Sequence, residues 1–399
     1  MSILLKNCAL VLTQDNGKIL KNTDIFIDGE NISIIGSKEK ADEILDCSNY
    51  LVCPGFINSH THAGMTLLRN TFDDLEFFEW LNSIWEKEKR YGDEEISRGL
   101  SLAIQEMINC GTTVFIDNYP YGKKSLEILE NASIIPVLAW PIIDEDKTTQ
   151  VGKPIENAEK IVSKKWRNIV PALGPHAVYS CSTELLEKTQ RLSEKYNVFK
   201  TIHVAETRKE LYFCLKNFKS RIVEYLEKIG FLDNKTLLSH VGWISKRESR
   251  ILGENKCAVC LNPVSNMKLG VGGVPPFEDF LEYNIPVCVG TDSAVSNNSL
   301  NIVESAKFAA LVQKHHNWEP SLFSAQQALD TITCIPGEFL EKNTGLKVGR
   351  IKEGYLANLV LFDLRKPQMI PSHNPAASII YSSSPDCISM VFCKGKRIK

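Results

Sequence analysis

The chain has 399 residues, enough to bury a large core in one large domain or in two to three smaller ones. Hydrophobic residues make up 43% and charged residues 24%, which is ordinary for a globular protein. The formal net charge of −2 gives no basic excess, so nucleic acid is not expected as a partner. Neither a run of roughly 18 apolar residues nor the signals of a secretory leader can be read in the sequence, so no membrane partner is expected.

Both ends of the chain alternate short apolar runs with turns. Residues 1–55 carry a hairpin signal at Asp28-Gly29, and the stretches 357–363 and 390–398 repeat this style near the other end. We therefore expect the two ends to form one small β-sandwich domain, made of residues 1–55 plus 344–399.

The middle of the chain, residues 56–343, alternates apolar strand candidates with amphipathic helix candidates. One strand is expected to end near His60, and others to cover 113–117, 134–139, 169–173, 199–204, 236–240, 258–261 and 286–291. Helices are expected at 93–109, 182–196, 208–228 and 300–314. Eight strands alternating with helices predict an α/β fold with a (β/α)8 TIM-type barrel. The first strand is not followed by Gly-x-Gly-x-x-Gly, which weighs against an open dinucleotide-binding sheet.

Twelve cysteines are scattered along the chain, mostly inside apolar runs. This pattern indicates buried thiols in a reducing compartment rather than a disulfide framework, so we expect a cytoplasmic protein. The single pair Cys257-Ala-Val-Cys260 lacks the second pair that a zinc ribbon needs, and we interpret it as a strand with buried thiols.

Histidines and carboxylates follow several of the expected strands. His60 and His62 are two residues apart, a spacing that places both side chains on the same side of a strand. The other strand-end residues of this kind are His176, His203, Glu206, His240 and Asp292. Each of them taken alone could have an ordinary structural role, but five of the eight histidines in the chain lie at the ends of predicted strands. In a (β/α)8 barrel the carboxyl ends of the strands converge on the face that holds the active site.

Four of these residues, His60, His62, His203 and Asp292, form a set of three nitrogens and one oxygen. Such a set suits one divalent ion, most readily Zn²⁺ and alternatively Fe²⁺. An ion with an open coordination position lowers the pKa of a bound water and so makes a nucleophile available.

The remaining polar residues are candidates for moving protons. Glu206 lies close to His203 but is not needed as a ligand, and zinc nucleobase deaminases use a non-ligand Glu as proton carrier. His240 could orient the attacking water, and Asp292 could pass its proton to the departing amine. His240 could instead bind a second metal; the expected fourth strand, 169–173, has no Lys that could become a bridging ligand, so we favour one metal.

Six segments together resemble the amidohydrolase superfamily. They are Pro54-Gly-Phe-Ile-Asn-Ser-His-Thr-His62, Gly174-Pro-His176, Ile202-His-Val-Ala-Glu-Thr207, Leu238-Ser-His240, Asn262-Pro-Val-Ser-Asn-Met-Lys-Leu-Gly270 and Gly290-Thr-Asp-Ser-Ala-Val-Ser-Asn-Asn-Ser-Leu-Asn301. The resemblance covers nearly the whole chain. It is strongest to the branch of 5′-methylthioadenosine/S-adenosylhomocysteine deaminases and 5′-deoxyadenosine deaminases.

The resemblance implies one Zn²⁺ on the four ligands named above, and relatives often form homo-oligomers, dimers or tetramers. It implies that Glu206 carries a proton and, with Asp292, contacts the purine, that His240 acts as a base, and that His176 contacts the nucleoside. It also implies a Glu after a Trp-containing helix as the ligand of the ribose diol. Here that residue is Glu88; the helix is one residue shorter than usual and lacks the usual Pro, so Glu86 is the alternative.

The chain departs from the pattern after the third expected strand. Relatives that handle S-adenosylhomocysteine well can carry arginines there, whereas residues 137–146 contain none, so a carboxylate tail would lose its bidentate partner. Trp140 in this stretch would suit an apolar 5′ group, and Lys153 could replace part of the lost binding. We therefore expect 5′-deoxyadenosine or 5′-methylthioadenosine to be preferred over S-adenosylhomocysteine, with S-adenosylhomocysteine and adenosine as further possible substrates.

The resemblance thus implies an enzyme that hydrolytically deaminates an adenosine-type nucleoside to the inosine analogue and ammonia. One alternative is another reaction on the same site, by a guanine or pterin deaminase or a triazine-type chlorohydrolase or aminohydrolase. A remote alternative is a barrel without catalytic activity that serves as an assembly scaffold; such proteins usually lose metal ligands, and here all are present.

Overall fold

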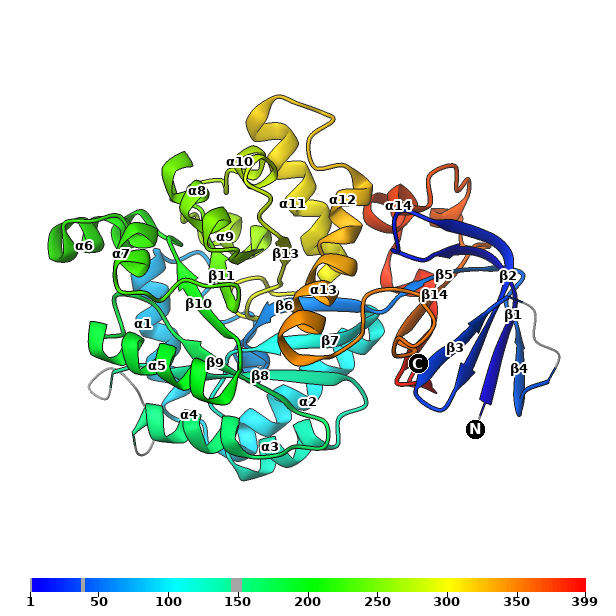
Figure 1. Cartoon of the computed structure of the whole chain (residues 1–399), viewed down its shortest axis with the longest axis horizontal. Coiled ribbons are helices and arrows are strands. Elements are labelled where there is room, and N and C mark those ends of the chain that lie inside the picture. The colour runs from blue at the N-terminus through cyan, green and yellow to red at the C-terminus, as the bar shows by residue number, and fades with distance from the viewer. Residues whose placement is uncertain (1, 37–39, 145–152) are drawn as a thin grey trace.

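The computed structural model describes residues 2–36, 40–144 and 153–399, in which the strands form two eight-stranded sheets (Figure 1). One sheet is parallel and follows chain order: β6 (Phe56–Thr61), β7 (Thr112–Asp117), β8 (Ile135–Ile142), β9 (Val170–Pro175), β10 (Lys200–Val204), β11 (Thr236–His240), β12 (Ala258–Leu261) and β13 (Val287–Val289). Its two edges meet where the Asp292 amide donates to the His60 carbonyl at 2.9 Å. The predicted (β/α)8 barrel is therefore confirmed.

The barrel strands are buried on both faces, which explains their unbroken apolar runs. Every residue of β6, β7 and β8 is buried. One face of β8 contributes Val137 and Ala139 to the cluster inside the barrel, while the other contributes Leu138 and Trp140 to a cluster against the outer helices. Parallel strands covered on both sides have this composition.

Helices connect the strands and cover the barrel (Figure 1). They are α1 (Phe77–Glu88), α2 (Asp93–Asn109), α3 (Lys123–Glu130), α4 (Pro154–Ser163), α5 (Thr183–Tyr196), α6 (Arg208–Phe218), α7 (Ile222–Lys228), α8 (Lys246–Glu254), α9 (Pro263–Lys268), α10 (Phe277–Glu282), α11 (Ile302–Asn317), α12 (Ala325–Asp330) and α13 (Cys334–Thr344). The predictions for α2, α5 and α11 are confirmed to within three residues. The single helix predicted at 208–228 is wrong, because Lys219 adopts a left-handed φ of 53° and ends α6 before α7 begins.

The second sheet is built from both ends of the chain, as predicted (Figure 1). It contains β1 (Ser2–Leu12), β2 (Ile19–Asp28), β3 (Asn31–Ile35), β4 (Glu43–Asp46), β5 (Tyr50–Pro54), β14 (Leu359–Asp363), β15 (Ile388–Cys393) and β16 (Lys396–Arg397). Antiparallel pairing of β5 with β14 joins the two ends. β1 pairs first with β4 and then with β5, and Ile3, Val52 and Phe392 share one hydrophobic cluster. The domain limits given above stay a prediction.

Two further expectations concern single elements. The predicted hairpin is confirmed, since Asp28 pairs with Asn31 across Gly29, whose φ of +58° suits a tight turn. Among the described residues, no helix combines the length and the apolar character that a bilayer crossing requires.

The amino-terminal end of the barrel, opposite the face where the strands end, contains an ion pair between a buried lysine and a partly exposed aspartate. The Lys200 side chain at the start of β10 is fully buried, and its Nζ lies 2.8 Å from Asp233 Oδ1. We predict that Asp233→Ala destabilises the protein by about 3–5 kcal/mol, because the Lys200 charge stays buried without its partner.

Denaturant unfolding with and without the substitution measures this loss. The matched control is Lys246→Ala, which removes an exposed ion pair with Glu282 and should change the midpoint little. Equal shifts in the two variants would contradict the assignment of Lys200 and Asp233 to the stability of the barrel.

Candidate active site and metal centre

The structure brings the predicted strand-end residues together at the carboxyl end of the barrel. The His60 ring centroid lies 4.9 Å from that of His62, 4.8 Å from that of His203 and 5.6 Å from that of His240. Asp292 faces the same point, with Oδ1 at 3.3 Å from His62 Nε2 and 3.7 Å from His60 Nε2. Side chains from the first strand, the last strand and the strands between them thus share one centre.

The donor atoms of this cluster fit a divalent metal ion. Ligand atoms of His60, His62 and Asp292 lie within 4.8 Å of one another, as do those of His60, His203 and His240. His62 Nε2 and His203 Nε2 are 3.4 Å apart. His60 Nε2 and His240 Nε2 are buried without a hydrogen-bond partner. Buried polar atoms are nearly always paired, so two orphaned nitrogens at one point indicate a missing partner such as a metal ion or its water.

Outer hydrogen bonds fix the imidazoles that could hold this ion. His62 Nδ1 donates to the Asn118 carbonyl and His203 Nδ1 to the His176 carbonyl, each at 2.7 Å. A carbonyl can only accept, so in the neutral rings the Nε2 lone pairs are free for the centre. Ser239 Oγ lies 3.0 Å from His60 Nδ1 and orients this ring as well, although a hydroxyl can either donate or accept there.

Asp292 is oriented by two hydroxyls that the sequence analysis missed. Ser265 and Ser296 donate to Oδ2 at 2.6 and 3.0 Å, which leaves Oδ1 for the histidines. Burial raises the pKa of Asp292, but its hydrogen bond to His62 and the nearby histidines outweigh this and hold it well below its ordinary value. Burial lowers the pKa of His62, yet Asp292 raises it to about 9. An ion bound between them would displace the shared proton.

Glu206 and His240 lie beside each other and beside Asp292 in this cluster. Burial raises the pKa of Glu206, although His240 opposes this shift, so the surroundings favour the protonated carboxyl more than water does. Its Oε1 lies 3.7 Å from His240 Nδ1. That nitrogen donates to Asn266 Oδ1 at 2.8 Å, so the neutral ring has its lone pair on the orphaned Nε2.

The predicted nucleoside-binding residues lie at the edge of this cluster. The His176 ring is 4.9 Å from that of His203 and 6.4 Å from that of Trp85 on α1. Burial, and then the neighbouring histidines, lower the pKa of His176 to about 4, so it is neutral at pH 7. Glu88 is the last residue of α1 and accepts a hydrogen bond from the Tyr119 hydroxyl.

Three other candidates are not part of the cluster. The Glu86 side chain is 67% exposed and pairs with Lys89, so the geometry favours Glu88 over Glu86. Trp140 belongs to the cluster between the barrel wall and the outer helices. In the apolar run around it, both faces of the strand are hydrophobic, and the sequence alone could not tell the inner face from the outer one. Lys153 is exposed and pairs with Glu156 at 3.6 Å, and the segment 145–152 lies outside the described residues.

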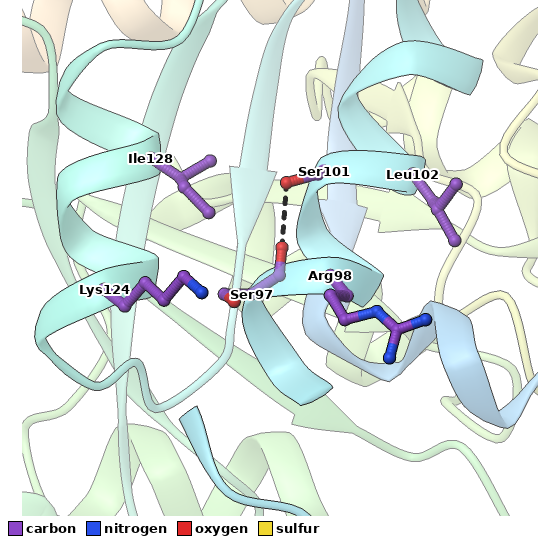
Figure 2. Close-up of a pocket in the computed structure, with 6 residues that line it drawn as sticks. All are labelled: Ser97, Arg98, Ser101, Leu102, Lys124 and Ile128. Atoms are coloured by element: carbon purple, nitrogen blue, oxygen red, sulfur yellow. Dashed lines mark hydrogen bonds between the residues drawn. The ribbon is translucent and has the colours of Figure 1, made fainter. Parts of the chain in front are cut away.

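A hollow of about 430 Å³ lies outside the barrel, between α2 and α3. Figure 2 shows Lys124 and Ile128 of α3 across from Ser97 and Ser101 of α2. Its lining is completed by Arg98 and Leu102. None of these six residues belongs to the cluster described above, so the hollow is separate from it.

Comparisons with known proteins agree with the motifs. Residues 51–398 match the model of the Amidohydrolase family. The chain is 36% identical to a 5-methylthioadenosine/S-adenosylhomocysteine deaminase of Archaeoglobus fulgidus, over 99% of this chain and 92% of the relative. It is 37% identical to a 5′-deoxyadenosine deaminase of Methanothrix thermoacetophila, over 96% and 91%. The fold is similar to that of a zinc-bound adenosine deaminase from Xanthomonas campestris, with a TM-score of 0.94, 24% identity and coverage of 99% and 92%.

The two hydroxyls on Asp292 generate a prediction about metal binding. Replacing Ser265 and Ser296 together by Ala should weaken Zn²⁺ binding by roughly 10–100-fold, because Oδ2 loses both donors. Metal content after competition with a chelator measures the change. Ser249→Ala is the control, since this buried hydroxyl donates within α8 to the Ser245 carbonyl, and it should leave the affinity unchanged. Unaltered affinity in the double variant would show that these hydroxyls do not support a metal ligand.

Proposed function

Because the chain belongs to the amidohydrolase family, we propose that it hydrolytically deaminates an adenosine-type nucleoside to the inosine analogue and ammonia. The observation that supports this proposal most directly is the convergence of three histidines and Asp292 beside Glu206, a carboxyl whose pKa is raised by burial. Two relatives covering nearly the whole chain have names that describe deamination of such nucleosides.

The proposed metal ligands are His60, His62, His203 and Asp292, with Zn²⁺ as the ion and Fe²⁺ as the alternative. The orphaned His60 Nε2 and the fixed His62 and His203 rings support this set. A divalent ion held there would lower the pKa of a bound water and so supply the nucleophile.

The proton steps follow from the side chains around the ion. His240 Nε2 orients the attacking water, whose oxygen bonds to the ring carbon that bears the amine. Glu206 donates its proton to the adjacent ring nitrogen, as a non-ligand Glu does in zinc deaminases. Asp292 takes one proton of the water and delivers it to the amine as the C–N bond breaks and ammonia leaves, and the second proton of the water returns to Glu206 as the ring carbonyl forms.

The nucleoside is bound by residues around the cluster. Glu88 accepts hydrogen bonds from the ribose diol, neutral His176 contacts the nucleoside, and Glu206 and Asp292 contact the purine. The preference for 5′-deoxyadenosine or 5′-methylthioadenosine over S-adenosylhomocysteine is supported by the lack of Arg in residues 137–146. Trp140 packs toward the outer helices, so this preference depends on the missing Arg instead.

The setting of the enzyme is also part of the proposal. All twelve cysteines are free, which fits a reducing compartment and a cytoplasmic location. A homo-oligomer, as a dimer or tetramer, is supported by the exposed apolar side chains Phe308, Leu311 and Trp318 on α11 and at its end.

An ammonia-release screen tests the proposed reaction. The Zn²⁺-loaded protein is given adenosine, 5′-deoxyadenosine, 5′-methylthioadenosine, S-adenosylhomocysteine, guanine and cytosine. We expect release from the adenine nucleosides, with kcat/KM highest for 5′-deoxyadenosine or 5′-methylthioadenosine. A kcat/KM that is highest for S-adenosylhomocysteine would contradict the expected preference for a small 5′ group. No ammonia release from any adenine nucleoside would contradict the proposed reaction.

Substitution of Glu88 tests the ribose contact. Glu88→Ala should raise KM for nucleosides by roughly 10–100-fold, because hydrogen bonds to a partly buried carboxylate are lost. Glu86→Ala is the matched control from the exposed side of the same helix and should leave KM unchanged. If Glu88→Ala also leaves KM unchanged, a free base such as guanine becomes the better substrate class.

A further inference from the structure

Tyr119 connects the loop after β7 to the end of α1. Its hydroxyl donates to Glu88 Oε1, and the residue is 4% exposed. The loop also supplies the Asn118 carbonyl that fixes His62. One short segment therefore contacts both a candidate metal ligand and the candidate ribose ligand.

The Tyr119 ring is held in one position by its surroundings. A Cβ added to Gly64 would lie 2.5 Å from Tyr119 Cε1, so the ring packs directly against the backbone before α1. The ring of Tyr121 lies 5.2 Å away, and its hydroxyl donates to buried Asp117. Asp117 in turn accepts from the Ala63 amide at 2.8 Å. A clamped ring presents its hydroxyl at a fixed point.

This hydroxyl acts on Glu88 in two ways. A carboxylate has about four acceptor positions, and one donor on Oε1 leaves the others for two ribose hydroxyls. Burial raises the pKa of Glu88, while the hydrogen bond from Tyr119 and the charge of His62 oppose the rise. Burial, together with Glu88 and Asp117, raises the pKa of Tyr119 well above its ordinary value, so the phenol keeps its proton and remains a donor.

We propose that Tyr119 is a positioning residue that orients the Glu88 carboxylate for the ribose diol. This proposal depends on the proposed function, in which Glu88 binds a nucleoside. A purely structural role for Tyr119 would be to fill space between Gly64 and Tyr121, which requires the ring and not the hydroxyl.

The test is Tyr119→Phe, which removes only the hydroxyl and keeps the packed ring. With 5′-deoxyadenosine as the probe, KM should rise by roughly 10-fold while kcat changes by less than about 2-fold. The acid limb of kcat/KM should move to higher pH, because Glu88 without its donor is protonated at higher pH and a protonated carboxyl accepts less well.

Tyr121→Phe is the matched control, because it removes an equally buried tyrosine–carboxylate hydrogen bond at Asp117 and leaves Glu88 untouched. It should change stability but neither KM nor the acid limb. Tyr119→Phe introduced into Glu88→Ala should add no further rise in KM, since the group that it orients is gone.

An unchanged KM and acid limb in Tyr119→Phe, in a protein where Glu88→Ala raises KM, would overturn the positioning role alone. An additional rise in KM when the two substitutions are combined would also overturn it. No effect of Glu88→Ala would overturn the role of Tyr119 together with the ribose contact, whereas deamination itself is judged separately by ammonia release.

Discussion

The closure of the barrel is the constraint on which the site depends. The backbone hydrogen bond from Asp292 to His60 joins the first strand to the residues after the last one. This close approach requires Gly290, where an added Cβ would lie 2.7 Å from the Cβ of His60 and 2.6 Å from Asn262 Oδ1. Asp292 itself has a left-handed φ of 61°. Through this closure, side chains that are far apart in the sequence come close enough together to bind one metal ion.

The surroundings of the two carboxylates in the site then shift their pKa values in different directions. Burial raises the pKa of Glu206 despite the opposing charges of His240 and His62, whereas the hydrogen bond to His62 and the nearby histidines hold the pKa of Asp292 well below its ordinary value. The pKa values of two carboxylates beside the same histidines thus shift in opposite directions because their surroundings differ. Each ring is aimed by a partner outside the cluster: a carbonyl for His62 and a serine for His60.

Much of this arrangement follows from the sequence, because strands, helices and strand-end histidines leave local patterns. The break between α6 and α7 does not, since it depends on one left-handed residue, Lys219, in a continuous helical pattern. Partners such as Ser265, Ser296 and Tyr119 come from segments whose contacts exist only in the folded chain. The outward packing of Trp140 could not be predicted from the sequence either, because both faces of β8 are apolar.

The central claim is that this site adds water to an adenine nucleoside and expels ammonia. Mass spectrometry of 5′-deoxyadenosine turned over by the Zn²⁺-loaded protein in ¹⁸O-labelled water tests it directly. We expect 5′-deoxyinosine with one ¹⁸O atom in place of the amine, together with one equivalent of ammonia. Recovery of unchanged nucleoside, or of a product that retains the amine, would contradict it.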